Sequence, residues 1–150
     1  MRRYGWRASR SAGSEVGRIL ALDHGTVRIG VAVTDAAGIS AHPQGFLAAA
    51  EPSLMASITE LVAELGVDCI LVGLPTGLRG SEGPAASAAR AFAGEVAEAT
   101  GVSVELVDER FTTAIAERAL IETGTRRKRR RQVRDGAAAA VLLQGYLERE

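Results

Sequence analysis

Three acidic residues lie where the sequence pattern predicts the ends of strands or the start of a helix. Asp23 follows the apolar run 19–22, Glu109 follows the predicted strand 102–107, and Asp135 falls in the first turn of the last predicted helix. Ligands of open α/β sheets bind outside the carboxyl ends of the parallel strands, and a helix N-terminus favours an anion. We therefore expect these three carboxylates to face one cleft.

Three carboxylates in one cleft repel each other strongly unless a cation lies between them. Ligation by oxygen alone suits Mg²⁺ or Mn²⁺. Two such ions about 4 Å apart would bind the attacking and leaving oxygens of a phosphodiester. Each acid taken singly is more commonly an exposed cap or turn charge, but the placement of all three at the ends of central elements favours a metal site.

The elements that must position these acids alternate in a recognisable order. A meander of strands comes first, and strands and helices then alternate, which predicts an α/β fold with a mixed sheet and helices on its faces. Pro43 places the third strand at an edge. The predicted strands are 19–22, 27–33, 39–47, 67–72 and 102–107, and the predicted helices are 54–65, 84–100, 112–123 and 133–148.

The chain has 18 basic and 18 acidic residues, so basic residues are not in excess. They are, however, concentrated in one segment. Six are consecutive between two predicted helices, and such runs are usually solvated. Because one of these helices follows Glu109 and the other carries Asp135, we expect this run to bind phosphates. The run comprises Arg126, Arg127, Lys128, Arg129, Arg130 and Arg131, and further candidates are Arg28, Arg79 and Arg110.

Length and composition indicate the number of domains, the redox compartment and the absence of a predicted membrane span. A chain of 150 residues predicts one domain, here 18–150, preceded by a disordered tail over 1–17 that is basic and rich in Ser and Gly. The one cysteine, Cys69, lies in an apolar run and is expected to be a buried thiol in a reducing compartment. No apolar stretch approaches the length of a membrane span.

Four short motifs, in order over 19–147, resemble the YqgF-like family of pre-16S rRNA nucleases, also described as Holliday junction resolvase-like proteins, of the RNase H-like superfamily. Each motif is weak alone, but four in order are specific. They read Leu22-Asp23-x-Gly25-x-x-Arg28-Ile29-Gly30-Val31-Ala32, Val72-Gly73-Leu74-Pro75 with Gly80, Val107-Asp108-Glu109-Arg110 with Thr112-Thr113, and Asp135-x-x-Ala138-Ala139 with Leu143-Gln144-x-Tyr146-Leu147.

The resemblance implies an RNase H-like five-stranded sheet, with an antiparallel three-strand meander and two parallel strands. It implies a cytoplasmic bacterial endonuclease that matures the 5′ end of 16S rRNA, with Asp23, Glu109 and Asp135 as the catalytic, metal-binding acids. The expected partners are precursor rRNA or branched DNA, a ribosomal precursor particle and a second copy of the chain, without a membrane. The heavy basic run and the long tail depart from the family pattern and leave the acids unaffected.

Other functions remain open from the residues alone. A Holliday junction resolvase would use the same acids on four-way DNA. An actin-like or sugar-kinase-like ATPase shares the superfamily core, and Asp23-x-Gly25-Thr26 resembles its first phosphate loop, but that fold needs two such domains. A non-catalytic RNA-binding factor would use only the basic run, and its binding would survive loss of Asp23.

Overall fold

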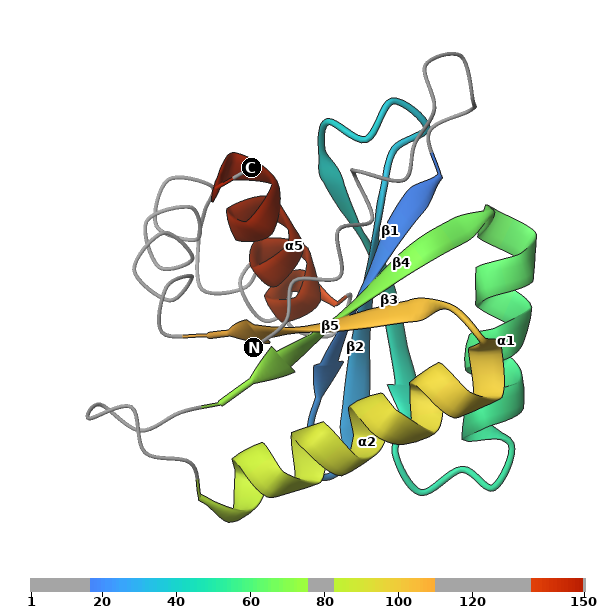
Figure 1. Cartoon of the computed structure of the whole chain (residues 1–150), viewed down its shortest axis with the longest axis vertical. Coiled ribbons are helices and arrows are strands. Elements are labelled where there is room, and N and C mark those ends of the chain that lie inside the picture. The colour runs from blue at the N-terminus through green and yellow to red at the C-terminus, as the bar shows by residue number, and fades with distance from the viewer. Residues whose placement is uncertain (1–16, 76–82, 110–135, 150) are drawn as a thin grey trace.

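Five strands form one mixed sheet in the order β3-β2-β1-β4-β5 (Figure 1). β1 pairs antiparallel with β2 and parallel with β4, β2 pairs antiparallel with β3, and β4 pairs parallel with β5. The predicted mixed sheet, with its antiparallel meander and two parallel strands, is therefore confirmed. The strands are β1 Arg18–His24, β2 Arg28–Thr34, β3 Ala41–Ala48, β4 Val67–Leu74 and β5 Ser103–Asp108.

The computed structural model describes residues 17–75, 83–109 and 136–149. Its helices are α1 Leu54–Leu65, α2 Pro84–Thr100 and α5 Ala137–Arg149. The expected tail, the glycine-rich loop, the helix 112–123 and the basic run lie wholly or almost wholly outside these ranges, so those expectations stay predictions. No helix in the described ranges is long and apolar enough to cross a membrane.

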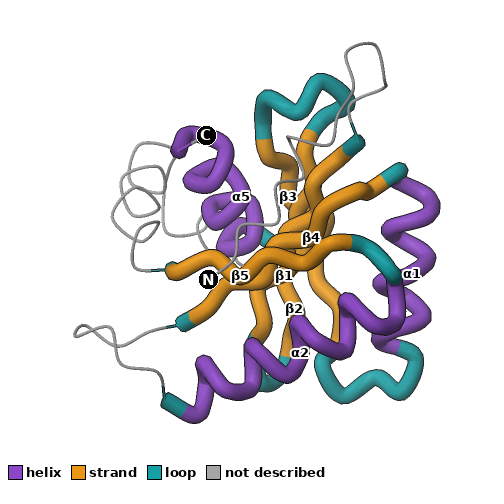
Figure 2. The backbone as a smooth tube through the Cα atoms, viewed as in Figure 1, coloured by secondary structure: helices purple, strands orange, loops and turns teal. Residues whose placement is uncertain are grey.

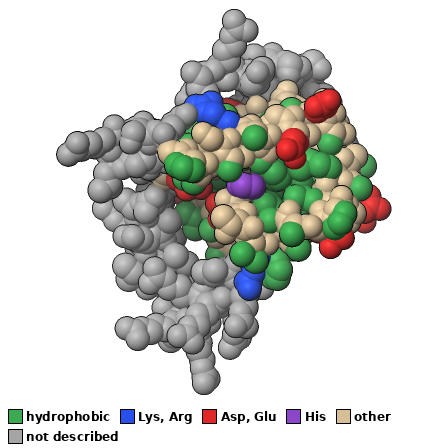
Figure 3. Space-filling model, turned by 90° about the horizontal axis from the view of Figure 1, so that it is seen from below, with side chains coloured by type: hydrophobic (Ala, Val, Ile, Leu, Met, Phe, Trp, Pro, Cys, Tyr) green, Lys and Arg blue, Asp and Glu red, His purple; other side chains and the backbone are tan. Residues whose placement is uncertain are grey.

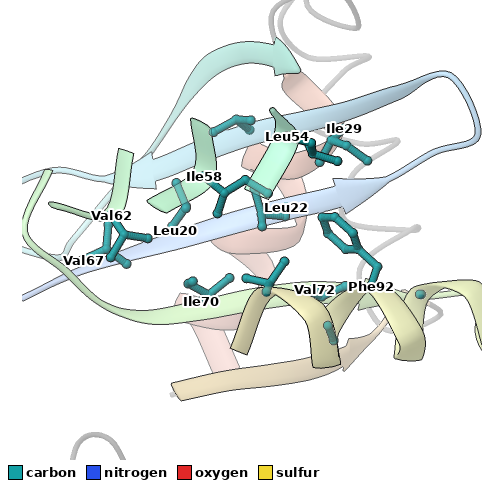
Figure 4. Close-up of a cluster of buried hydrophobic side chains, with 14 of the residues drawn as sticks. Leu20, Leu22, Ile29, Leu54, Ile58, Val62, Val67, Ile70, Val72 and Phe92 are labelled. Atoms are coloured by element: carbon teal, nitrogen blue, oxygen red, sulfur yellow. The ribbon is translucent and has the colours of Figure 1, made fainter. Parts of the chain in front are cut away.

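Helices cover both faces of the sheet, with α1 and α2 on one face and α5 on the other (Figure 2). Strand side chains alternate between these faces. In β1, Leu20 and Leu22 pack with α1 and α2 in a large hydrophobic cluster (Figure 4), whereas Ile19 and Ala21 pack against α5. The buried thiol of Cys69 belongs to the α5 side, as expected from its apolar run.

Glycines end the first two helices where the sequence predicts it. Gly66 and Gly101 adopt positive φ angles of 65° and 70°, and each backbone N–H donates to a carbonyl in the last helical turn. On α1 the buried residues are Leu54, Ile58 and Val62, whereas Leu61 and Leu65 are only partly buried.

The last helix begins later than predicted. Gly136 has a φ of 87°, which cannot continue an α-helix, and α5 begins at Ala137 rather than near residue 133. The predicted start of this helix near residue 133 is therefore wrong. Asp135 itself lies outside the described residues.

Gly136 packs against a β-bulge in the edge strand β3. The β2–β3 register shifts so that Val31 pairs with Gly45 and Ala32 with Pro43, which leaves Gln44 without a β2 partner. A Cβ atom on Gly136 would meet the carbonyl oxygen of Gly45 at 2.5 Å and would lie closer still to that of Val31. Only glycine therefore fits where the chain enters α5.

Candidate metal-binding active site

Asp23 lies near the carboxyl end of β1, the central strand of the sheet. It is partly buried, and it pairs with Gly30 of β2. A Cβ on Gly30 would lie 3.5 Å from the Asp23 Cβ and 3.7 Å from the Ala139 Cβ. The Asp23 side chain is therefore on the α5 face of the sheet, beside a position that carries no side chain.

Glu109 directly follows β5, and its backbone N–H donates to the carbonyl oxygen of Leu74 at 3.2 Å. This bond continues the β4–β5 pairing by one residue beyond the strand. Gly73 of β4 lies beneath the Glu109 side chain, because a Cβ at Gly73 would meet Glu109 Oε1 at 2.5 Å. Because Gly73 has no side chain, the Glu109 carboxyl can lie across β4.

The two carboxyl groups meet although β1 and β5 are not neighbouring strands. The Glu109 side chain is hydrogen-bonded to that of Asp23, and its pKa is raised to about 7. Partial burial is the largest cause, followed by the charge of Asp23, the hydrogen bond to Asp23 and the charge of Asp108. The Glu109 carboxyl is therefore partly protonated near neutral pH, and a divalent cation between the oxygens could replace its proton.

The raised pKa of Glu109 predicts how the stability of the metal-free protein depends on pH. The folded-state pKa of Glu109, about 7, lies above the ordinary value of 4.5, so the native state binds more protons than the unfolded state between these values. The free energy of unfolding should therefore decrease as the pH rises from about 4.5 to about 7. Urea unfolding in the presence of a chelator, at pH 5 and at pH 8, measures this dependence.

A matched pair of variants isolates the contribution of Glu109. Glu109→Gln should flatten the decrease, because the amide does not titrate and does not repel Asp23. Glu98→Gln removes an exposed carboxylate from α2 and should leave the decrease as in the wild type. An equal pH dependence in the wild type and in Glu109→Gln would show that this carboxyl does not carry the effect.

The third predicted acid, Asp135, is next in the chain to a described residue, Gly136. Within the described ranges, no group of three His, Cys, Asp or Glu residues could hold a metal ion. The Gly136 Cα, however, would lie 3.8 Å from a Cβ on Gly30, the residue paired with Asp23. The residue next to Asp135 in the chain is therefore beside the carboxylate pair.

The predicted basic residues fall almost entirely outside the described ranges. Arg28 is the exception, and its guanidinium carbon lies 4.9 Å from the ring centre of Phe46. Arg79, Arg110 and the run Arg126–Arg131 are not described, so their roles stay predictions. His24, which is next to Asp23, stacks on Phe92 of α2 with ring centres 4.7 Å apart, so it belongs to the other face of the sheet.

The described part of the chain is acidic. It holds 12 of the 18 Asp and Glu residues but only four of the 18 basic ones, which are Arg18, Arg28, Arg90 and Arg149. In Figure 3, Lys and Arg side chains of this part appear only as small patches beside the grey region. Any strong attraction for a polyanion must therefore come largely from the remaining segments, which contain the basic run.

Several residues that shape this site were not singled out as functional residues from the sequence. Gly30 and Gly73 appear in the family motifs, but motif spacing does not reveal which side chain needs the space beside a glycine. The sequence features that point to Gly136 and Phe46 are weaker. A glycine immediately after an expected acid and before a helix, and an aromatic residue in a chain with 4% aromatics, are the features that could have drawn attention to them.

Solved structures with the same arrangement define the class of fold. The RuvC protein of T. thermophilus in complex with a Holliday junction substrate matches with a TM-score of 0.58 at 15% identity, over 89% of this chain and 96% of that chain. Thermus thermophilus RuvC in another structure matches with a TM-score of 0.51 at 16% identity, over 88% and 96% of the two chains. The fold is that of the RuvC and RNase H-like nucleases.

Sequence comparison then gives the family. Residues 17–149 match the model of RuvX, described as Holliday junction resolvase. Proteins of Moorella thermoacetica (46% identical; 88% of this chain and 95% of the relative) and Pelotomaculum thermopropionicum (47% identical; 87% and 86%) are each named "Putative pre-16S rRNA nuclease". The chain belongs to the RuvX family, a family of nucleases, as its motifs predicted.

Proposed function

We propose that this protein is a metal-dependent endonuclease that hydrolyses phosphodiester bonds in precursor 16S rRNA during maturation of its 5′ end. The observation that carries the proposal is the contact between the Asp23 and Glu109 side chains at the carboxyl ends of β1 and β5. The names of the relatives support the rRNA substrate. The protein would act in the cytoplasm, on precursor rRNA alone or in a ribosomal precursor particle, and as a monomer or a homodimer.

Asp23 and Glu109 fit a divalent cation because they offer only oxygen ligands and because a cation between them would offset the repulsion of their charges. Mg²⁺ or Mn²⁺ would be held by these two residues and by Asp135. Asp135 directly precedes Gly136, which packs beside Gly30. When bound, a pair of such ions stabilises the attacking and leaving oxygens of the phosphodiester. Zn²⁺ should substitute poorly at a site without nitrogen or sulfur ligands.

The surrounding residues keep the acids in place. Because Gly30 has no side chain, Gly136 and Ala139 at the start of α5 pack closely beside Asp23. Glu109 is fixed by its backbone bond to Leu74 and by its path over Gly73. The protein thus positions the carboxylates before the cation and the substrate bind.

A substrate panel tests this proposal. Purified protein should cleave a precursor 16S rRNA fragment in Mg²⁺ or Mn²⁺, and a chelator should abolish the cleavage. Four-way DNA junctions form the second arm, because the family description names a Holliday junction resolvase. Faster cleavage of junctions than of precursor rRNA would favour that alternative, and cleavage that survives exhaustive chelation would contradict the metal site.

The basic run should determine the electrostatic part of substrate binding. Because the described part of the chain is acidic, replacing several of the residues Arg126–Arg131 with Gln should weaken binding to all sequences and reduce its salt dependence. Turnover at saturating substrate should change much less. Salt titrations of binding by wild type and variant measure the two slopes, and equal slopes would identify the run as a solvated linker.

A further inference from the structure

Phe46 of β3 is an exposed aromatic residue with a cation over its ring. Its relative exposure is 47%, and the Arg28 guanidinium carbon lies 4.9 Å from the ring centre. The other large hydrophobic residues exposed in the described ranges are Val27 and Ile39, which are aliphatic. Phe46 is therefore the aromatic residue that the described part of the chain offers at its surface.

The position of Phe46 relates it to the carboxylate pair. Asp23 pairs with Gly30 across β1 and β2, and Gly30 pairs with Phe46 across β2 and β3. Directly paired residues point to the same face of a sheet, so Phe46 lies on the same face as Asp23. Two strand spacings separate them, about 10 Å, and the start of α5 packs over Gly30 between them, with Ala139 Cβ 3.7 Å from the Cβ position of Gly30.

We propose that Phe46 and Arg28 form a stacking platform for an unpaired base next to the phosphodiester that is cleaved, which makes a single-stranded segment the substrate at this site. The inference rests on the proposed nuclease function and specifies its substrate class. An aromatic ring stacks on the face of any base, and the guanidinium can add a cation–π contact or reach a phosphate. A base within a duplex already has neighbours on both faces and cannot offer one to the ring.

The acidic surroundings favour this mode of binding. The described residues near the site repel phosphates, and Arg28 is one of only four basic residues in the described ranges. Stacking on Phe46 does not depend on a net positive charge. It therefore holds the substrate beside the carboxylates, while the strong electrostatic attraction comes from elsewhere.

A fluorescence experiment tests whether a base contacts this ring. Trp6 is the only tryptophan of the chain, so Trp6→Phe with Phe46→Trp reports from position 46 alone. In the presence of a chelator, a single-stranded RNA oligonucleotide should quench this fluorescence strongly, and a fully paired RNA duplex should not. The matched control is Trp6→Phe with Ile39→Trp, at another exposed hydrophobic position, which should show little quenching. Equal quenching at both positions, or by duplex and single strand alike, would overturn the proposal.

Binding and cleavage then separate this inference from the proposed function. Phe46→Ala should weaken binding of the single-stranded oligonucleotide by about 5- to 150-fold, the range for loss of one base–aromatic stack. Phe46→Trp should retain binding, and Ile39→Ala should leave it unchanged. Quenching and weakened binding without cleavage of precursor rRNA by the wild type would support the platform and contradict the nuclease function. If the wild type cleaves precursor rRNA and Phe46→Ala changes neither cleavage nor binding, the nuclease function would be supported and the platform contradicted.

Discussion

Replacing Asp23 with Asn is expected to lower the rate of cleavage by at least about a thousandfold, because the amide keeps the shape of the side chain but loses a metal-binding charge. The fold should survive, since Asp23 is only partly buried and is paired through its backbone with Gly30. In the absence of metal above pH 7, the variant should even be more stable than the wild type, because the Asp23 charge contributes to the raised pKa of Glu109. Single-turnover cleavage and urea unfolding of the same preparation measure both effects.

The companion variant Glu109→Gln should fail in the same way, and the double variant should be little worse than either single one, because the acids act as a unit. Glu98→Gln on the exposed face of α2 is the charge-matched control and should cleave normally. A folded Asp23→Asn protein that cleaves at the wild-type rate would remove the basis of the proposed active site.

Gly73→Ala is expected to abolish most cleavage without touching any of the acids. The new methyl group would occupy the space of Glu109 Oε1, which lies 2.5 Å from the Cβ position. Because this atom is the end of a flexible side chain, the carboxyl can move away and the fold should persist. Displacing it from Asp23 costs one metal ligand, so a loss of at least about a hundredfold is expected, as for other small misplacements at a reacting centre.

Gly94→Ala is the matched control, since a Cβ at Gly94 in α2 meets no atom within 4 Å. That variant should cleave normally and gain slightly in stability, because alanine favours a helix over glycine by up to about 1 kcal/mol. Metal titration of Gly73→Ala, followed by calorimetry, should show weakened Mg²⁺ binding. Normal metal affinity and normal cleavage would mean that Glu109 does not need the path over β4.

The sequence alone determined the strands, the order of elements and the acids that end two of the strands. Apolar runs identified β1 and β4, and Pro43 identified the edge strand, because each of these signals is local in the chain. Gly66 and Gly101 marked helix ends for the same reason. The position of Asp23 and Glu109 after predicted strands was sufficient to predict a shared cleft, although not their contact.

Only the tertiary structure decided how the carboxyl groups meet. Asp23 and Glu109 come from strands separated by β4, and they meet because Gly73 lacks the side chain that would keep them apart. The raised pKa of Glu109 follows from that contact and from burial. The start of α5 depends in the same way on Gly136 fitting the bulge at Gly45. Such relations join residues distant in the chain through the space between them, and local periodicity carries no information about that space.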